Sequence, residues 1–398
     1  MAALPALWLL GTAGAQIHVL AVQRPWSSTA WLVILAVPVA FLAGAVAARL
    51  IVRGRVPRAP ASPGLTSPRR RILVGLLLVG FAELAREFAT GGSVPLLSSN
   101  IDAARTHVSA GPLSLLTGAL TVCLMLALVS PRRLSARSAR PEIAVAAAAI
   151  AGLVLGGGRE TVLVPLASAL IARAFYWRPP SVRALVLTGI LGLELGALVF
   201  YLRTGQDVHQ AFAVELYGHV VPRTPAPLVP LLPIHFALAL NQTVLAQVVD
   251  YFPHRMPFGH GIYDTYALHA VLPSRSLGTI TSKLTAPWFA STFAGPMWAD
   301  GGVPVVILGS LVTGAVTQTP YELFTRTRRF SHVLLAGYFA TIAMFCVYDS
   351  LLTQYKDWVF VGAALLLFGS ACEGTTRADA RGQPAVPPRE PPVASGAR

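Results

Sequence analysis

Charged residues are scarce in this chain, because only 12% of its 398 residues are Asp, Glu, Lys or Arg. A soluble protein of this length normally carries about twice that fraction. Hydrophobic residues make up 54% of the chain, and the mean hydropathy is +0.62. Uncharged runs of about 18 residues recur, and each is long enough to cross a bilayer core of roughly 30 Å. The scarcity of charge therefore excludes an ordinary soluble domain and predicts an integral membrane protein.

Lysine is nearly absent, since Lys283 and Lys356 are the only lysines among 31 basic residues. A net charge of +14 would suit a nucleic-acid partner if the arginines formed one continuous basic face. Instead the arginines are concentrated in four short loops between apolar runs, at residues 53–71, 132–140, 178–183 and 326–329. Cytoplasmic loops of membrane proteins are rich in Arg and Lys in this way. The pattern excludes nucleic acid as a partner and predicts that the four loops are cytoplasmic.

The chain also lacks the motifs of several enzyme classes. Its three cysteines, Cys123, Cys346 and Cys372, have the spacing of neither a disulfide framework nor a metal site. The P-loop pattern GxxxxGK(S/T) is missing, which excludes a built-in nucleotidase. DxD and HExxH are missing too, so we expect neither a metal site nor a metal-held nucleotide sugar, and no cofactor is predicted. An anionic leaving group would then have to be stabilised by arginines and helix ends.

The apolar runs predict an all-α polytopic membrane protein with about ten transmembrane helices. The predicted spans are residues 3–20, 29–50, 72–89, 112–130, 142–156, 161–176, 184–202, 302–318, 331–349 and 357–371. If these spans alternate in direction, the arginine-rich loops fall on one side and both termini lie in the cytoplasm. The mixed polar residues then lie in the outer segments, so we expect any chemistry to face outward.

This arrangement divides the chain into four regions. They are an N-terminal bundle of seven spans (1–202), a large extracytoplasmic loop (203–301), the C-terminal spans (302–372) and a disordered cytoplasmic tail (373–398). Within the large loop, residues 226–249 are nearly apolar enough to cross the membrane. A single crossing there would move the 326–329 arginines outside, so we interpret this run as a re-entrant or interfacial helix. A paired crossing with 284–299 would preserve the topology as well.

Two arginines on the outer side are candidates for an anion site. Arg159, with Glu160, ends a predicted span after three glycines, and the next predicted helix starts at once, so backbone amides and a guanidinium group would be available together. Arg203 ends the seventh span, just after Tyr201. Guanidinium groups match phosphate oxygens bidentately, so two such arginines could hold a pyrophosphate. The alternative is that each is a helix-end arginine whose side chain extends to the membrane interface.

The segment FAELAREFA places charge within a span. Glu83 and Glu87 share a helix face, and Arg86 is offset by one position. Because charge inside a membrane is costly, we expect this cluster to face the bundle interior or a water-filled cavity. Two interpretations stay open. The carboxylates orient a sugar hydroxyl or act as a base, or the cluster is an ion-pair network that locks helices together. Glu194, in the seventh span, is equally ambiguous.

His260 and Asp300 are the other candidates for a catalytic base. His260 belongs to HRMPFGHGIYDTYALHAVLP, whose histidines have no recognised metal-site spacing. Asp300 lies in FAGPMWADGG, directly before the predicted span 302–318. Both residues belong to the large outer loop of the predicted topology.

Three segments together resemble the oligosaccharide repeat-unit polymerases of bacterial surface polysaccharides, the O-antigen polymerase family within the O-antigen polymerase/ligase superfamily. GGSVPLLSSNIDAAR resembles an outer loop of that family through Gly92, Pro95, Leu96, Asp102 and Arg105. LGGGRETVLVPL is similar to its small-small-Arg-Gly turn, with Glu160 in place of the usual glycine. PMWADGGVPVVILGSLVTGAV resembles an aromatic residue and Asp-x-Gly before a glycine-containing span, through Trp298, Asp300, Gly301, Gly309 and Gly314. With PFGHG and STF, the resemblance extends over roughly two thirds of the chain.

This resemblance implies a class C glycosyltransferase-like bundle in the bacterial inner (cytoplasmic) membrane. Such an enzyme moves a growing glycan from undecaprenyl diphosphate to the next lipid-linked repeat unit on the outer leaflet, without a metal. Its partners would be the lipid-linked oligosaccharide, membrane lipids, a flippase and a chain-length regulator. Segment 91–113 would be polar because it covers a cavity for sugars, with its Val94–Leu97 patch resting against lipid or the bundle.

The resemblance also assigns roles to the candidate residues. Those predicted to bind substrate or diphosphate are Arg86, Asp102, Arg105, Arg159, Tyr201 and Arg203. The base that accepts the acceptor's hydroxyl proton would be one of Glu83, Glu87, His260 and Asp300. Three alternatives remain from the sequence. They are an O-antigen ligase-type transferase, a transporter or flippase for lipid-linked oligosaccharides, and a non-catalytic partner of a polysaccharide machine. The lack of visible internal repeats argues against a transporter.

Overall fold

The computed structural model describes residues 3–17, 23, 25–58, 70–98, 112–129, 140–156, 159–176, 236–260, 291–348 and 355–372. Over these residues the fold is all-helical and contains no strand. The elements are α1 (Ala3–Ala15), α2 (Ser28–Arg55), α3 (Arg70–Gly91), η1 (Pro95–Leu97), η2 (Pro112–Thr117), α5 (Gly118–Val129), α6 (Arg140–Leu155), α7 (Arg159–Tyr176), the π-helical η5 (Phe236–Leu240), α11 (Asn241–Tyr251), α13 (Ala294–Thr327), α14 (Phe330–Phe345) and α15 (Tyr355–Ala371).

Nine of the ten predicted spans coincide with helices, and the tenth, 184–202, lies outside the described residues. Among the helices described, α2 and α13 are long and apolar enough to cross a membrane. The other apolar helices are shorter, such as the 16-residue α14, which is about 24 Å long at 1.5 Å per residue. The helical class predicted from the sequence is therefore confirmed, while two of the described helices combine the length and the apolar composition that a crossing requires.

The outer face of α2 carries a continuous apolar stripe. Its exposed large side chains recur every three or four residues, at Leu32, Leu35, Val39, Leu42, Val46 and Leu50. From Leu32 to Leu50 this stripe is about 27 Å long at the α-helical rise, close to the roughly 30 Å of a bilayer core. The opposite face, with Val33, Val37 and Phe41, is buried against the protein. The two faces together are what a helix between lipid and a protein bundle requires.

Helices α2 and α13 pack unusually closely because glycines lie at their contact. A Cβ on Gly44 would collide with the backbone carbonyl of Leu311, and one on Gly314 would collide with the carbonyl of Phe41. Small residues allow helix backbones to approach in this way inside membranes. Gly314, one of the residues that carry the family resemblance in the sequence, therefore has a packing role in this contact.

The arginine-rich ends of two predicted spans lie together. Arg53 Nε is 3.2 Å from Glu322 Oε2, and Arg326 Nη2 donates to the Arg53 carbonyl at 3.3 Å. The ends of α5 and α7 meet similarly, since Arg173 Nη1 donates to the Leu128 carbonyl at 2.9 Å. The predicted topology places the members of each pair on one side of the membrane, and these contacts agree with it.

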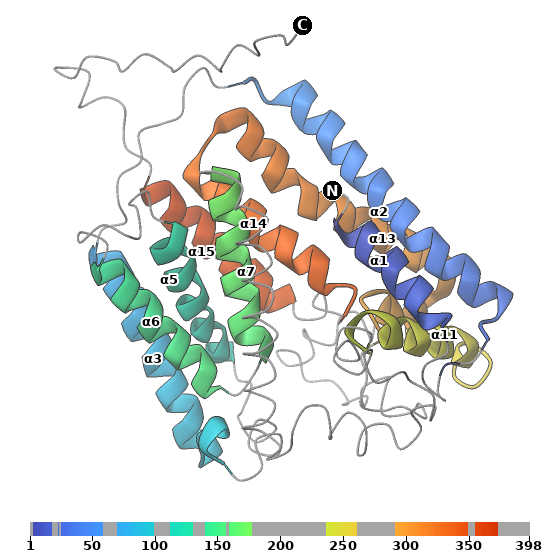
Figure 1. The fold of residues 1–398 in the computed structure, drawn as a ribbon, viewed down its shortest axis with the longest axis horizontal. Helices are drawn as coiled ribbons and strands as arrows, with labels where there is room; N and C mark the ends of the chain where they lie inside the picture. The colour runs from blue at the N-terminus through green and yellow to red at the C-terminus, as the bar shows by residue number, and fades with distance from the viewer. Residues whose placement is uncertain are drawn as a thin grey trace, which may run out of the picture.

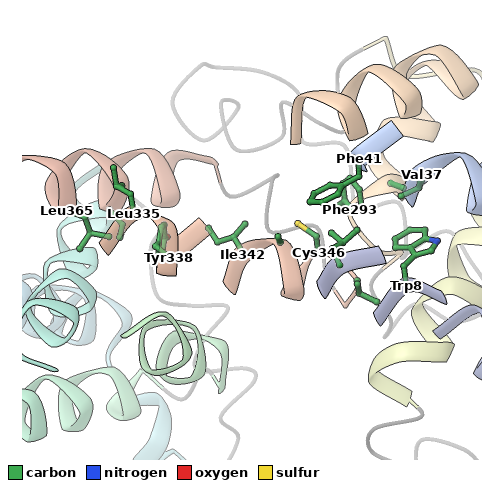
Figure 2. Close-up of a cluster of buried hydrophobic side chains, with 14 of the residues drawn as sticks. Trp8, Val37, Phe41, Phe293, Leu335, Tyr338, Ile342, Cys346 and Leu365 are labelled. Atoms are coloured by element: carbon green, nitrogen blue, oxygen red, sulfur yellow. The ribbon is translucent and has the colours of Figure 1, made fainter. Parts of the chain in front are cut away.

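Helix α14 connects the two halves of the molecule. Figure 1 shows α3, α5, α6 and α7 grouped on one side, and α1, α2, α11 and α13 on the other. The buried side chains of α14 run from Leu335 and Tyr338 to Ile342, and Cys346 follows directly after the helix (Figure 2). At the far end, Trp8 contacts Phe293 edge-to-face with ring centroids 5.9 Å apart (Figure 2). One apolar core therefore joins the helix groups.

Candidate functional site

Helix α13 is broken at the residues that the sequence identified as a site. Gly301 (φ −169°, ψ 22°) and Gly302 (φ 65°, ψ −149°) are both non-helical. Only glycine readily adopts the conformation of Gly302. The break separates a first segment, residues 294–300, from a second segment, residues 303–327. The predicted span 302–318 therefore begins at the observed break, and its helix continues to Thr327.

The first segment folds back along the second. A side-chain carbon on Gly309 would collide with the thioether of Met297. In a continuous helix these two residues would be about 18 Å apart, because each residue advances the helix by 1.5 Å. The contact therefore requires a sharp reversal at the two glycines. The Gly–Gly pair itself is the one local signal for this reversal in the sequence.

The chain after α11 is fixed to this break by main-chain hydrogen bonds. The Gly259 amide donates to the Ala299 carbonyl at 2.8 Å, and the His260 amide donates to the Asp300 carbonyl at 2.9 Å. These bonds satisfy carbonyls at the end of the first segment that have no partner within a helix. Trp298 Nε1 donates to the Phe252 carbonyl at 3.2 Å, which fixes the start of the same stretch.

His260 and Asp300, both predicted as base candidates, are thus neighbours through their main chains. Asp300 is buried, with 3% of its surface exposed, whereas His260 is exposed and has a positive φ of 52°. A buried carboxylate is costly unless it has partners or serves a function. The PFGHG and WADGG motifs, about forty residues apart, form one structural unit.

A cavity of about 390 Å³ lies beside this unit. Its walls come from the N-terminal end of α2, the C-terminal end of α11, the turn after α11 and the glycine break of α13. The lining residues are Ser27, Thr29, Val249, Asp250, Phe252, Pro253, His254, Phe258, Trp298, Gly301, Gly302, Val303 and Pro304. Asp300 directly precedes the two glycines in this wall.

Ser27 connects two walls of the cavity. Its hydroxyl accepts a hydrogen bond from the Ala30 amide at 3.1 Å as the N-cap of α2, and it donates to Asp250 Oδ1 at 2.6 Å. Ser27 and Asp250 were not among the residues predicted from the sequence. The Ser-Ser-Thr run at the start of α2 is a recognisable capping signal, but Asp250, the partner of Ser27, is 223 residues away.

The Glu83 cluster lies elsewhere in the molecule. Arg86 binds both carboxylate oxygens of Glu83, with Nε to Oε2 at 2.9 Å and Nη2 to Oε1 at 2.6 Å. Glu83 and Glu87 are buried, so the expectation that they face the protein interior is confirmed. The ion pair is internal to α3, so it does not itself lock two helices together. Figure 1 shows α3 and α11 on opposite sides, which separates this cluster from the α13 break.

A second cavity, of about 610 Å³, lies at the end of α3. It is lined by Phe88, Ala89, Gly92, Ser93, Val94, Leu97 and Ser98, which belong to α3 and the start of the polar loop predicted from the sequence. The Val94–Leu97 patch is predicted to rest against lipid or the bundle, and Pro95 within it is buried. Leu97 is 77% exposed.

The remaining predicted residues are described only in part. Helix α7 begins at Arg159, two residues before the predicted span 161–176, and the Thr161 hydroxyl in its first turn donates to the Leu153 carbonyl at 3.3 Å. The side chain of Arg159 lies outside the described residues, as does the whole of Asp102, Arg105, Tyr201 and Arg203. Glu194 lies outside them too.

In the parts of the chain that the structure describes, no group of three or more His, Cys, Asp or Glu residues is placed to hold a metal ion. Comparisons of the chain with protein-family models, curated proteins and solved structures find no match.

Proposed function

We propose that this chain is a multi-pass glycosyltransferase of the bacterial inner membrane, with both termini cytoplasmic. It polymerises lipid-linked oligosaccharide repeat units by transferring the growing glycan from a polyprenyl diphosphate to an acceptor repeat unit at the outer leaflet. The observation that carries the proposal is the buried carboxylate of Asp300 beside His260, at the break of α13 and next to a cavity.

The position of this unit supports an outward-facing site. The cavity lies at the N-terminal end of α2, whereas Arg53, Glu322 and Arg326 gather at its C-terminal end. The 28 residues of α2 separate these ends by about 42 Å at the α-helical rise. Since arginine-rich ends are cytoplasmic in most membrane proteins, the cavity end is assigned to the outside.

The proposed chemistry is a direct glycosyl transfer to a hydroxyl group, without a metal. The acceptor hydroxyl attacks the anomeric carbon of the donor glycan and gives its proton to Asp300 or His260. The bond between that carbon and the diphosphate oxygen breaks, and the lipid diphosphate leaves with the electron pair. A positioned base contributes about 10²–10⁴-fold to such a step.

The other candidate residues take supporting roles in the proposal. Arg159 and Arg203 hold the donor diphosphate, helped by the helix start at Arg159, and Asp102, Arg105 and Tyr201 position donor or acceptor. Arg86 is assigned to Glu83 rather than to the diphosphate, because both its bonds already go to that carboxylate. The base is therefore assigned to the α13 break and not to α3.

Reconstitution tests this proposal most directly. The purified full-length protein, in detergent, is given lipid-linked repeat units, and the products are separated as a ladder on a gel. We expect a ladder from the wild type and a loss of about 10²–10⁴-fold in rate from Asp300→Asn. Glu142→Gln, which removes a buried carboxylate from α6, is the matched control and keeps the ladder.

Two results would contradict the proposal. The first is the absence of any ladder from wild-type protein that elutes as a single folded species. The second is an Asp300→Asn, His260→Ala double variant that extends repeat units at the wild-type rate.

A further inference from the structure

The cavity between α2, α11 and the α13 break has the wrong charge for a diphosphate. None of its thirteen described lining residues is Arg or Lys, and one, Asp250, carries a carboxylate. The positive end of a helix would ordinarily favour an anion. At the N-terminal end of α2, the carboxylate of Asp250 already provides a negative charge, since its Oδ1 accepts a 2.6 Å hydrogen bond from the N-cap hydroxyl of Ser27. A second anion would meet like-charge repulsion there.

The polar groups of this cavity instead suit a ligand with several hydroxyl groups. Ser27 uses Oδ1 of Asp250, and no hydrogen bond to Oδ2 occurs among the described residues. Thr29 adds a hydroxyl, and His254 adds ring nitrogens that donate or accept. An ionised carboxylate can only accept hydrogen bonds, so Asp250 favours the hydroxyl donors of a neutral polyol and disfavours a phosphate.

The cavity also has apolar and aromatic lining residues. Phe258 packs edge-to-face against Trp298, with ring centroids 6.2 Å apart and an interplanar angle of 80°. Gly301 and Gly302 carry no side chain, so the main chain forms the wall beside these rings. A pyranose ring has apolar C–H faces and a polar edge, and it therefore matches a cavity with both aromatic and polar lining residues. Small-molecule sites commonly combine apolar walls with a few placed polar groups.

We propose that this cavity is the acceptor subsite and that it binds an uncharged sugar ring at the end of the incoming repeat unit. Asp250 and Thr29 bind ring hydroxyls, and Phe258 and Trp298 contact a ring face. The donor diphosphate binds elsewhere. The assignment rests on the proposed function, because only a transferase needs separate donor and acceptor sites. Asp300 directly precedes Gly301, which lines the cavity, so the proposed base and the proposed acceptor subsite adjoin each other along the chain.

A binding experiment tests the subsite independently of catalysis. The probe is the free oligosaccharide released by mild acid from the lipid-linked repeat units of the producing strain. Saturation-transfer NMR measures its binding to the full-length protein in detergent, with and without inorganic pyrophosphate as a competitor. We expect the wild type to bind the oligosaccharide and pyrophosphate not to displace it.

Two variants locate that binding within the cavity. Asp250→Asn keeps an oxygen to accept from Ser27 but removes the charge, and Thr29→Val removes the hydroxyl at similar size. We expect each to weaken oligosaccharide binding about tenfold. Thr319→Val is the matched control, since the Thr319 hydroxyl bonds its own helix at the Ala315 carbonyl, 2.7 Å away. In the ladder assay, both cavity variants raise the acceptor KM while kcat stays within about twofold.

The subsite is refuted if the wild type gives no oligosaccharide signal, if pyrophosphate displaces the sugar, or if both cavity variants bind as the wild type does. The binding and ladder assays together distinguish failure of the subsite from failure of the proposed function. Sugar binding that is lost in both variants, together with an absent ladder, would retain the subsite and reject the polymerase. A ladder with an unchanged acceptor KM in both variants would retain the polymerase and reject the subsite.

Discussion

The amide of His260 donates a hydrogen bond to the carbonyl of Asp300 at 2.9 Å, which joins two segments of the chain at the break of α13. This bond lies at the end of a short helix that has folded back at Gly301 and Gly302. The main chain that carries the Asp300 carboxylate is therefore held in place by hydrogen bonds at the break of α13. Catalytic groups need positions defined to well under an ångström, and a fixed backbone provides them.

Gly302→Ala is the first test of this arrangement. An alanine at φ 65° and ψ −149° is strained by about 1–3 kcal/mol, and its Cβ would lie 3.1 Å from the Phe258 ring. We expect lower thermal stability in detergent, followed by circular dichroism, and loss of ladder formation. Gly54→Ala is the control, because a Cβ there meets no atom within 4 Å and alanine favours a helix. A Gly302→Ala protein as stable as the wild type would contradict the observed break.

The close contact of α2 and α13 gives the second test. Gly314→Leu forces a side chain into the Phe41 carbonyl, so the two helices must separate. Overpacking of this kind costs about 1–3 kcal/mol or more. We expect a lower midpoint in SDS unfolding, whereas Gly75→Ala, where a Cβ meets no atom within 4 Å, leaves the midpoint unchanged or raised. A cysteine pair across the contact that cross-links equally well in Gly314→Leu would argue against the separation.

Hydropathy identified the helices and not their partners. Apolar runs predicted the helices at nine of the ten proposed spans, because this signal depends on residues near in sequence, and the predicted span 302–318 begins at the observed break. The contacts of Ser27 with Asp250 and of Arg53 with Glu322 join residues 223 and 269 positions apart. No local periodicity encodes such pairs. The role of α3 was left open for another reason, because the spacing of Glu83 and Arg86 fits both an ion pair and a base beside a cation.

The buried carboxylate of Glu322 gives the third test. Oε2 pairs with Arg53, and Oε1 accepts from Gln318 Nε2 at 3.1 Å. Removing one member of a fully buried pair costs 3–5 kcal/mol. Here the Arg53 side chain is 44% exposed and can be hydrated, so we expect about 1–2 kcal/mol for Glu322→Gln. Arg55→Gln, at an exposed arginine with no ion pair among the described residues, should change stability little.

A double-mutant cycle with Arg53→Gln checks that estimate. If the two residues stabilise the α2–α13 contact together, the double variant loses less stability than the sum of the single variants. Strict additivity would mean that the 3.2 Å contact contributes nothing to the free energy of unfolding.

The Glu83–Arg86 pair gives the fourth test, and the unequal exposure of its members sets the direction. The Glu83 side chain is 4% exposed and that of Arg86 is 35% exposed. Arg86→Gln leaves a buried carboxylate without its bidentate donor, at a cost of about 1–3 kcal/mol. Glu83→Gln leaves a cation that water can still reach, so its cost should be smaller. Unfolding of both variants in SDS measures the difference.

The double variant Glu83→Gln, Arg86→Gln then separates a structural role from a catalytic one. With both charges gone, no buried ion is left unpaired, so stability should recover toward that of Glu83→Gln. If α3 only supports the fold, the ladder assay on this double variant should give a rate near the wild type. A fall of 10²-fold or more in a folded double variant would return the base to α3, because removing a catalytic base costs about that much. It would also remove that role from Asp300.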